Sequence, residues 1–310
     1  MKTSTSKRLR WNVAIWLAAG LFMTSTAGMA SGPILPDPKA EARHHPQIEE
    51  TANGIPLVNI TAPSSGGVSR NEYEMFNVPD KGAILNNSYT LSKTELAGYV
   101  PGNNNMAERP AKIIVNEVTG TGSTSMDGFL EVAGNRADVV IANPNGITVN
   151  GGGFINTGKA FLTTGKPVYD GEDHLQRFDI TGGDILIEGK GLGGKETESL
   201  AILSRAVKIN AGIWAEDLHI TTGANTVDAK TLEASAIEGK GGRPAFALDT
   251  AAIGGMYAGR ITLVGTEKGL GVNNSGTWSA EDNLTLDWNG DLKNSGTIYS
   301  KGNTDLRASR

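Results

Sequence analysis

The feature that most limits how this chain can fold is a series of short segments in which apolar and polar residues alternate. A period of two puts successive side chains on opposite faces, as in a β-strand. Four triplets have it: Val207-Lys208-Ile209, Leu218-His219-Ile220, Ile261-Thr262-Leu263 and Leu284-Thr285-Leu286. Two further segments keep the apolar spacing: Ile113-Ile114-Val115 and Ile185-Leu186-Ile187. Gly, Asn, Asp and Ser separate these runs, as turns require, and residues 196–207 are the only helix candidate.

A repeat of about 20 residues is visible near the end of the chain. Asn274-Ser275-Gly276-Thr277-Trp278 recurs as Asn294-Ser295-Gly296-Thr297-Ile298, and the same offset relates Asn283 to Asn303 and Leu286 to Leu306. A fainter echo relates residues 214–218 to residues 278–282, both beginning with Trp. Brief strands with Gly and Asn corners at this period favour a parallel β-helix. We therefore predict an all-β fold of roughly 9–12 stacked coils, with the middle residues of the four triplets facing solvent.

The composition excludes several classes of protein. The chain has no Cys, which rules out disulfides and Cys-based metal sites. Its formal charge of −5 is a poor match for the phosphates of nucleic acid.

The first thirty residues have the pattern of a secretory signal peptide. Four basic residues precede an apolar stretch from Trp11 to Phe22, and small residues lead to a cut after Ala30. A membrane anchor is the alternative, but the apolar stretch is short of the ~20 residues that span a bilayer. Residues 1–30 are therefore expected to direct export.

The rest of the chain divides into three parts. Residues 31–52 contain four prolines and are expected to form an extended leader with little fold of its own. Residues 53–270 form the main domain, whose irregular first part, residues 53–110, is expected to cap the helix against end-to-end pairing. Residues 271–310 begin the 20-residue repeats, which still run at Arg310, so we expect a chain cut short or a natural truncation.

Several ordered motifs resemble the N-terminal secretion domain of two-partner secretion exoproteins, the filamentous haemagglutinin family. The similarity runs from about Asn53 to Leu270 and is greatest to the haemolysins and contact-dependent growth-inhibition toxins. The motifs are Asn53-Gly54-Ile55-Pro56-Leu57-Val58-Asn59-Ile60, Phe76-Asn77-Val78, Leu85-Asn86-Asn87-Ser88, Ile114-Val115-Asn116-Glu117-Val118-Thr119, Phe129-Leu130-Glu131-Val132-Ala133-Gly134, Ala137-Asp138-Val139-Val140-Ile141-Ala142, Asn143-Pro144-Asn145-Gly146-Ile147 and Gly153-Phe154-Ile155-Asn156-Thr157.

This resemblance implies a right-handed parallel β-helix with an N-terminal β cap and small extra-helical strands. It also implies type V secretion: export to the periplasm, recognition by the periplasmic domains of a partner outer-membrane barrel transporter, and folding outside a Gram-negative cell. The secreted product would reside at the cell surface or in the medium, where host or neighbouring-cell receptors are possible partners.

Two positions depart from the family pattern. The family often has Asn-Pro-Asn-Leu where this chain has Asn103-Asn104-Asn105-Met106. Without the Pro, which fixes φ, we expect a looser corner there. The haemolysin-like subgroup often has a Cys-x-x-Cys pair at the positions of Val149 and Gly152, so a disulfide is absent here.

The most specific candidate site is Asn143-Pro144-Asn145-Gly146-Ile147. Pro144 restricts Asn143 to extended geometry, and Asn145-Gly146 supplies positive φ for a tight corner. Transporter recognition and a purely structural turn both explain these residues. The other candidates for recognition or folding are Asn53, Gly54, Asn59, Asn103, Asn105, Asn116 and Glu117.

Catalytic and cofactor motifs are weak. The segment Gly189-Lys190-Gly191-Leu192-Gly193-Gly194-Lys195 has phosphate-loop spacing, but Glu196 replaces the Ser or Thr that would bind Mg²⁺. Adjacent histidines, His44 and His45, lack the spacing of a specific metal site. Acids that a polysaccharide enzyme could use are Asp179, Asp184, Glu188, Asp217 and Asp228, and possible glycan-stacking residues are Trp214, Trp278 and Trp288. Solvated acids and packed tryptophans are the simpler interpretation, so we expect no enzyme, cofactor or metal.

Three functions follow from the sequence. We expect a secretion-targeting domain that also nucleates folding of an adhesin or toxin. A self-sufficient adhesin that binds glycans or cells is the second, and a β-helical polysaccharide enzyme the third.

Overall fold

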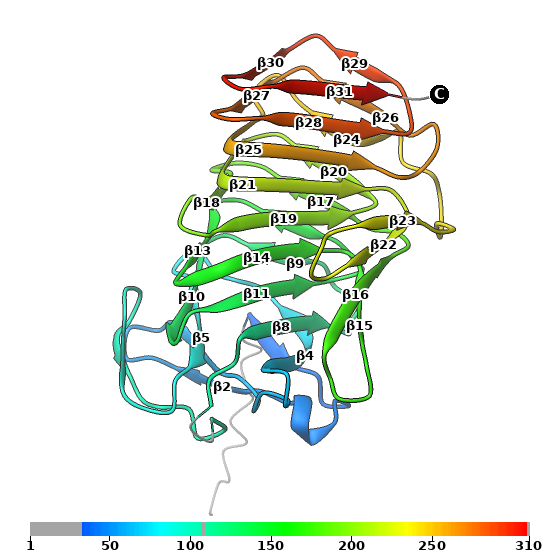
Figure 1. Ribbon diagram of the computed structural model, residues 1–310. Helices are drawn as coiled ribbons and strands as arrows, with labels where there is room; N and C mark the ends of the chain where they lie inside the picture. Colours follow the sequence, from blue (N-terminus) through cyan, green and yellow to red (C-terminus); the bar gives the residue numbers. More distant parts are fainter. Residues whose placement is uncertain (1–32, 107–108, 309–310) are drawn as a thin grey trace, which may run out of the picture. The chain divides into compact units, whose positions relative to one another are not determined.

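The structure is a computed structural model that describes residues 33–106 and 109–308. The expected signal peptide, residues 1–30, lies outside the described residues. The described chain consists of short β-strands and one 3-10 turn, η1 (Ala42–His44). Most strands pair in parallel with strands one coil away, which makes the fold a parallel β-helix (Figure 1). No helix in the described part of the chain is long and apolar enough to cross a membrane.

Three faces wind around the helix. Along the first face the described strands run in parallel, in the order β4 (Val68–Phe76), β8 (Ile113–Val118), β11 (Ala137–Ala142), β14 (Thr157–Thr163), β19 (Ser199–Ser204), β21 (Gly212–Thr222), β25 (Gly255–Gly265), β28 (Leu284–Trp288) and β31 (Thr304–Ala308). These nine described strands match the lower end of the expected number of coils.

The second face consists of β3 (Pro56–Asn59), β5 (Ala83–Asn87), β10 (Phe129–Gly134), β13 (Gly152–Ile155), β18 (Leu192–Gly194), the first halves of β21 and β25, β27 (Thr277–Ala280) and β30 (Thr297–Ser300). The third face consists of β9 (Thr124–Met126), β12 (Ile147–Val149), β17 (Asp184–Ile187), β20 (Ala206–Ile209), β24 (Phe246–Thr250), β26 (Gly271–Asn274) and β29 (Leu292–Asn294).

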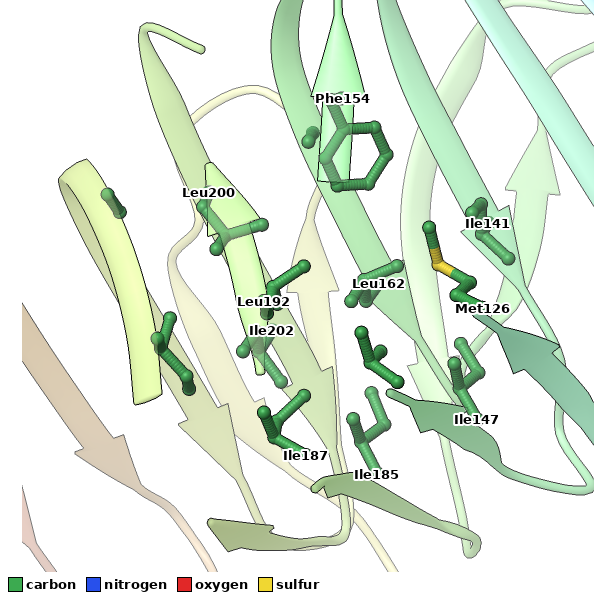
Figure 2. Close-up of a cluster of buried hydrophobic side chains, with 14 of the residues drawn as sticks. Met126, Ile141, Ile147, Phe154, Leu162, Ile185, Ile187, Leu192, Leu200 and Ile202 are labelled. Carbon is green, nitrogen blue, oxygen red and sulfur yellow. The ribbon is translucent and has the colours of Figure 1, made fainter. Parts of the chain in front are cut away.

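The inward side chains of all three faces form one continuous core. Figure 2 shows part of it, where Ile147, Ile185 and Ile187 of the third face meet Leu162 and Ile202 of the first. Burial alternates along the strands: in β20 the outward Lys208 is exposed between buried neighbours. The other three middle residues, His219, Thr262 and Thr285, are only partly exposed, so the expectation that all four face solvent holds fully for Lys208 alone. Alternation therefore determines which residues form the core.

The 20-residue repeat is one coil of the helix. Asn274 pairs in register with Asn294, and its side-chain amide donates to Oδ1 of Asn294 at 2.8 Å. Leu286 pairs with Leu306 in the same way. The fainter similarity between residues 214–218 and 278–282 predicts a register that is wrong by one residue. Trp214 is aligned with Tyr257 and Ser279 rather than with Trp278.

Two additions lie outside the helix. The first is a four-stranded antiparallel sheet of β15 (Lys166–Tyr169), β16 (Leu175–Ile180), β22 (Asn225–Asp228) and β23 (Ala234–Ala236). It covers the outer side of the first face, where Phe178 packs against Phe161 in a second apolar cluster. The second is the hairpin β6 (Ser92–Thr94) and β7 (Gly98–Val100) beside β10.

The N-terminal segment has more structure than expected. The strand β1 (Ile34–Pro36) pairs antiparallel with β4, and β2 (Gln47–Glu50) pairs antiparallel with β3. The expectation that residues 31–52 have little fold of their own is wrong, because these strands cap the first coils. The boundaries at residues 52 and 270 stay predictions.

The helix candidate at residues 196–207 is also wrong. It contains β19 and the start of β20, and Leu200 and Ile202 point into the core. A β-strand has an available partner there, since β19 pairs with β14 on one side and β21 on the other.

Candidate functional site

The corner at Asn143–Gly146 joins β11 on the first face to β12 on the third. The Oδ1 atom of Asn143 accepts hydrogen bonds from the backbone N–H of Asn145 at 2.9 Å and from the Asn145 side-chain amide at 3.0 Å. The N–H of Gly146 closes the turn on the Asn143 carbonyl at 3.1 Å. Gly146 has φ of 111°, which an L side chain rarely adopts, so the positive φ expected from the sequence is confirmed.

This corner is bonded to the chain that precedes it. The side-chain amide of Asn143, which is fully buried, donates to the Gly122 carbonyl at 2.9 Å and to Oγ1 of Thr124 at 3.0 Å. The Asn145 amide donates to the Gly120 carbonyl at 2.8 Å. Since a buried polar group without a partner is costly, both side chains tie the corner to an earlier coil.

Asn103–Met106 forms the same turn in the cap. Oδ1 of Asn103 accepts from the N–H of Asn105 at 2.9 Å, and the N–H of Met106 donates to the Asn103 carbonyl at 3.1 Å. The Asn103 amide donates to the carbonyls of Ile60 and Asn86, both at 2.9 Å. These lengths equal those at Asn143, so the expectation of a looser corner without Pro is wrong.

Asn156 is a third corner of this kind, which the sequence did not single out as a site. It has φ of 53°, and its amide donates to the carbonyls of Val132 at 2.7 Å and Gly134 at 3.1 Å, again one coil earlier. We call Asn103, Asn143 and Asn156 the corner asparagines. The sequence signal for Asn156 is an Asn at a coil corner directly before the first residue of a strand, here Thr157 of β14.

Asn53 and Gly54 lie in the turn between β2 and β3. Gly54 has φ of 77°, and its N–H donates to the Thr51 carbonyl at 2.9 Å. The exposed Asn53 accepts from Oγ1 of Thr51 and donates to the Leu96 carbonyl at 2.9 Å. This contact joins the cap turn to the β6–β7 hairpin.

Asn59 and Asn116 lie inside strands and face other polar side chains. The Asn86 amide donates to Oδ1 of Asn59 at 2.8 Å. The hydroxyl of the buried Tyr73 donates to Oδ1 of Asn116 at 3.0 Å, and the Asn116 amide donates forward to the Val140 carbonyl at 3.1 Å. These residues satisfy buried polar groups between the first coils and present no surface to a partner in the folded chain.

Glu117 belongs to a partly buried cluster of charges. Nη2 of Arg70 lies 3.3 Å from Glu117 Oε2 and 2.8 Å from Glu72 Oε1, and the Arg70 guanidinium lies 4.4 Å above the Tyr169 ring. Nδ1 of His44 lies 3.1 Å from Glu72. Burial raises the pKa of Glu117 and lowers the pKa of His44.

This cluster combines the cap, the first coils and the extra-helical sheet. His44 comes from η1, Arg70 and Glu72 from β4, Glu117 from β8 and Tyr169 from β15. Of these, sequence reasoning identified only Glu117 as a site residue. No local pattern signals the others, because their partners lie far away in the chain.

Asp179 and Asp228, two of the candidate catalytic acids, lie on the neighbouring strands β16 and β22, with Arg177 opposite Asp228 in register. The other three, Asp184, Glu188 and Asp217, lie in β17, just after β17 and in β21. Asp179 pairs with Arg177 and Asp217 with Arg260, at 2.8 and 3.0 Å, while Asp228 accepts from the backbone of its own turn. Asp184 lies 3.6 Å from Lys208. Their partners are basic groups or backbone, which is the solvated arrangement that the sequence favoured.

The remaining weak motifs have structural roles. Gly189 and Gly191, at φ of 56° and 82°, make the corner between β17 and β18. No group of three or more His, Asp or Glu within the described ranges is arranged to hold a metal ion. Trp278 and Trp288 are buried in the core, whereas Trp214 is 36 % exposed.

A capped β-solenoid whose corners are tied to earlier coils is the class that this geometry defines, and comparisons with known proteins specify it. The sequence profile of the TPS secretion domain matches residues 33–298. A crystal structure of the filamentous hemagglutinin secretion domain superposes with a TM-score of 0.74 at 31 % identity, covering 90 % of this chain and 97 % of that one. The chain belongs to the TPS secretion domain family, as the motifs predicted.

Curated relatives agree with this assignment. The chain is 43 % identical to Toxin CdiA of Yersinia pestis over 89 % of its length, and 43 % identical to the 16S rRNA endonuclease CdiA of Enterobacter cloacae over 90 %. It is 42 % identical to the tRNA nuclease CdiA-2 of Burkholderia pseudomallei over 83 %. The matched region spans only 9 %, 8 % and 8 % of these relatives and is their secretion domain.

The expected family and fold are confirmed by these matches. This is a secretion domain of the kind found in CdiA and filamentous haemagglutinin exoproteins, which are secreted across the Gram-negative outer membrane. Membership implies a cognate outer-membrane transporter.

Proposed function

We propose that this domain delivers its exoprotein by being recognised unfolded and then folding outside the cell from its N-terminal end. The periplasmic domains of the cognate transporter bind the chain after Sec export. The cap and first coils then form outside and template the coils that follow. The observation that supports this order is the direction of the bonds at the three corner asparagines: Asn103, Asn143 and Asn156 each donate to carbonyls that precede them in the chain.

This direction supports folding in the order of emergence. When Asn143 leaves the transporter, its acceptors at Gly122 and Thr124 have already emerged. Each new coil then finds a finished surface on which to pair and bury apolar area, at roughly 25 cal/mol per Å². Contacts are mostly with neighbouring coils, so stability accumulates coil by coil. A folded coil cannot return through the pore, which makes transport directional without ATP.

The same strands explain recognition before folding. An isolated coil buries too little surface to offset its ordering entropy, so the chain in the periplasm stays partly unfolded. Its alternating segments can add to an exposed sheet edge of the transporter, where main-chain hydrogen bonds give affinity. Pro144 and Asn145 are exposed in the folded corner, so the folded core does not require their side chains, which is compatible with a role in recognition before folding.

The activity of the longer exoprotein that this domain would deliver is a separate proposal. The relatives are toxins or nucleases by name, and the shared part is the secretion domain. This domain therefore acts in delivery rather than catalysis, and it accompanies an adhesin or a growth-inhibition toxin. Surface receptors would be bound by the parent protein.

The test is co-expression with the partner transporter and measurement of extracellular yield. Asn143→Ala removes the bonds to the preceding coil, and a Val-Val replacement of Asn145-Gly146 removes the turn. Both should lower the yield severalfold, while Asn104→Ala, at an exposed position of the matching turn, should not. Binding of each urea-unfolded variant to the isolated periplasmic domains separates recognition from folding. Normal secretion of both corner variants would refute the proposal.

A further inference from the structure

A column of aromatic residues and glycines runs along the outer side of the second face. Seven positions in register across successive coils are Phe129, Gly153, Gly193, Trp214, Tyr257, Ser279 and Tyr299. We call these seven residues the aromatic column. The strands that carry it, β10, β13, β18, β21, β25, β27 and β30, succeed one another up the left side of Figure 1.

The four rings of the column are exposed to solvent. Phe129 is 44 % exposed, Trp214 36 %, Tyr257 39 % and Tyr299 51 %. Their strand neighbours on either side, such as Ile213, Ala215 and Met256, point into the core. The outward position of the rings therefore follows from the strand alternation, and the core does not require them.

Three of the rings lie over glycines. A Cβ atom at Gly212 would come 2.4 Å from the ring of Trp214, one at Gly153 would come 2.4 Å from Phe129, and one at Gly255 would meet the Tyr257 ring at 2.9 Å. A ring that leans over bare backbone covers it with one side and turns the other outward. The rings of Trp214 and Tyr257 are nearly parallel, at 16°, with centroids 6.2 Å apart.

The surroundings of the column are polar and small. Two residues before the aromatic column along each strand lies a second set of in-register positions: Gly212, Gly255, Thr277 and Thr297. The exposed Glu216 lies two residues after Trp214. Flat rings flanked by hydroxyls suit a sugar, whose C–H face stacks on an aromatic ring while its hydroxyls bond to the edges. A protein partner would need a continuous apolar patch, which Gly, Ser and Thr interrupt here.

The spacing adds a constraint on the ligand. Tyr257 and Tyr299 are separated by two coils, about 10 Å, which is close to the length of a disaccharide. Every position of the column is paired in register with the next, so the column continues from coil to coil and matches an extended polymer. Glu216, two residues after Trp214 on the same side of the strand, carries a carboxylate, which disfavours an acidic polymer.

We infer that the aromatic column of the folded domain binds a linear, uncharged polysaccharide, with Trp214 and Tyr257 as the central stacking pair. This activity belongs to the folded, secreted domain and does not depend on the proposed secretion mechanism.

The test is calorimetric titration of the purified chain with cellohexaose, chitohexaose and xylohexaose. Trp fluorescence of the chain without residues 1–30 reports the same event, because Trp278 and Trp288 are buried and Trp214, its third tryptophan, is partly exposed. At least one probe should bind, and a Trp214→Ala/Tyr257→Ala double variant should bind it roughly tenfold more weakly or not at all. Trp214→Phe should retain most of the affinity.

The matched control is Tyr89→Ala, which removes a ring that is 48 % exposed but lies outside the column. It should leave binding unchanged. Thermal unfolding of each variant confirms that the fold is intact, and Trp214→Phe serves if the double variant does not fold. Absence of binding to all three probes at millimolar concentration would overturn the inference, as would equal binding by the double variant. Self-association of the chain that the double variant abolishes would overturn it in favour of a second copy as the occupant.

Discussion

Oδ2 of Asp173 accepts a hydrogen bond from Nη1 of Arg43 at 2.5 Å, although the two residues are 130 positions apart. Arg43 lies in η1 of the cap, and Asp173 lies in the loop between β15 and β16 with φ of 58°. The extra-helical sheet therefore contacts the N-terminal segment directly. This later sheet adds a contact to a cap that already pairs with the first coils through β1 and β2.

Removing the charge of Asp173 should release this part of the cap. Asp173→Asn keeps a residue that tolerates positive φ but loses the ion pair with Arg43 and the proximity to His44, whose Nε2 lies 3.9 Å away. Trypsin should then cleave after Lys39 or Arg43 several times faster. Global stability should change by less than about 1 kcal/mol, because the pair is partly exposed. Glu172→Gln, at an exposed neighbour, is the control, and equal cleavage rates in the two variants would contradict the prediction.

The free energy of unfolding should decrease as the pH is lowered, because His219 binds a proton more readily in the unfolded chain. Burial lowers the pKa of His219 to about 4, compared with about 6.5 in an unfolded chain. Between these values the unfolded chain binds a proton that the folded chain does not, so acidification favours unfolding. The full contribution is on the order of 3 kcal/mol, present above pH 6.5 and lost as pH falls toward 4.

Urea unfolding at pH 7.5 and pH 4.5 checks this prediction. His219→Gln, which can keep a hydrogen bond to Thr221, should lose markedly less stability over that interval than the unmodified chain. The pKa of His44 is also lowered by burial, so part of the acid sensitivity should remain in the variant. Identical pH dependence in both proteins would show that His219 does not contribute.

Features of the fold that are set by neighbouring residues or neighbouring coils could be predicted from the sequence. Alternation within a triplet such as Val207-Lys208-Ile209 identifies a strand, because one face of every strand is buried. The 20-residue offset of Asn274 and Asn294 identifies the coil, because each coil repeats the environment of the last. Both signals need only neighbouring residues or neighbouring coils.

Signals that depend on register or on distant partners were lost. Trp214 and Trp278 begin similar segments, but a shift of one residue turns the first outward and the second into the core. Residues 31–52 read as a leader because Pro and charge are typical of one, while the pairing of β2 with β3 is invisible in the segment itself. The charge cluster around Arg70 was missed for the same reason.

Gly254, Gly276 and Gly296 are stacked at one corner of the final coils. A Cβ atom at Gly276 would lie 2.1 Å from the Gly254 carbonyl oxygen, and one at Gly296 would lie 2.1 Å from the Gly276 carbonyl oxygen. These oxygens are backbone atoms that also accept hydrogen bonds from Thr277 and Thr297. Gly276→Ala should therefore force adjacent coils apart, at a cost of about 2–4 kcal/mol.

Because a solenoid coil contacts mainly its neighbours, the damage from Gly276→Ala should be local. Hydrogen exchange should accelerate in β26 to β31 and stay slow in β8, β11 and β14. Gly171→Ala, where an added Cβ meets nothing within 4 Å, should leave exchange unchanged throughout. Uniform acceleration along the whole chain would mean that the coils unfold as one unit, and the coil-by-coil folding on which the proposed export mechanism depends would then be excluded.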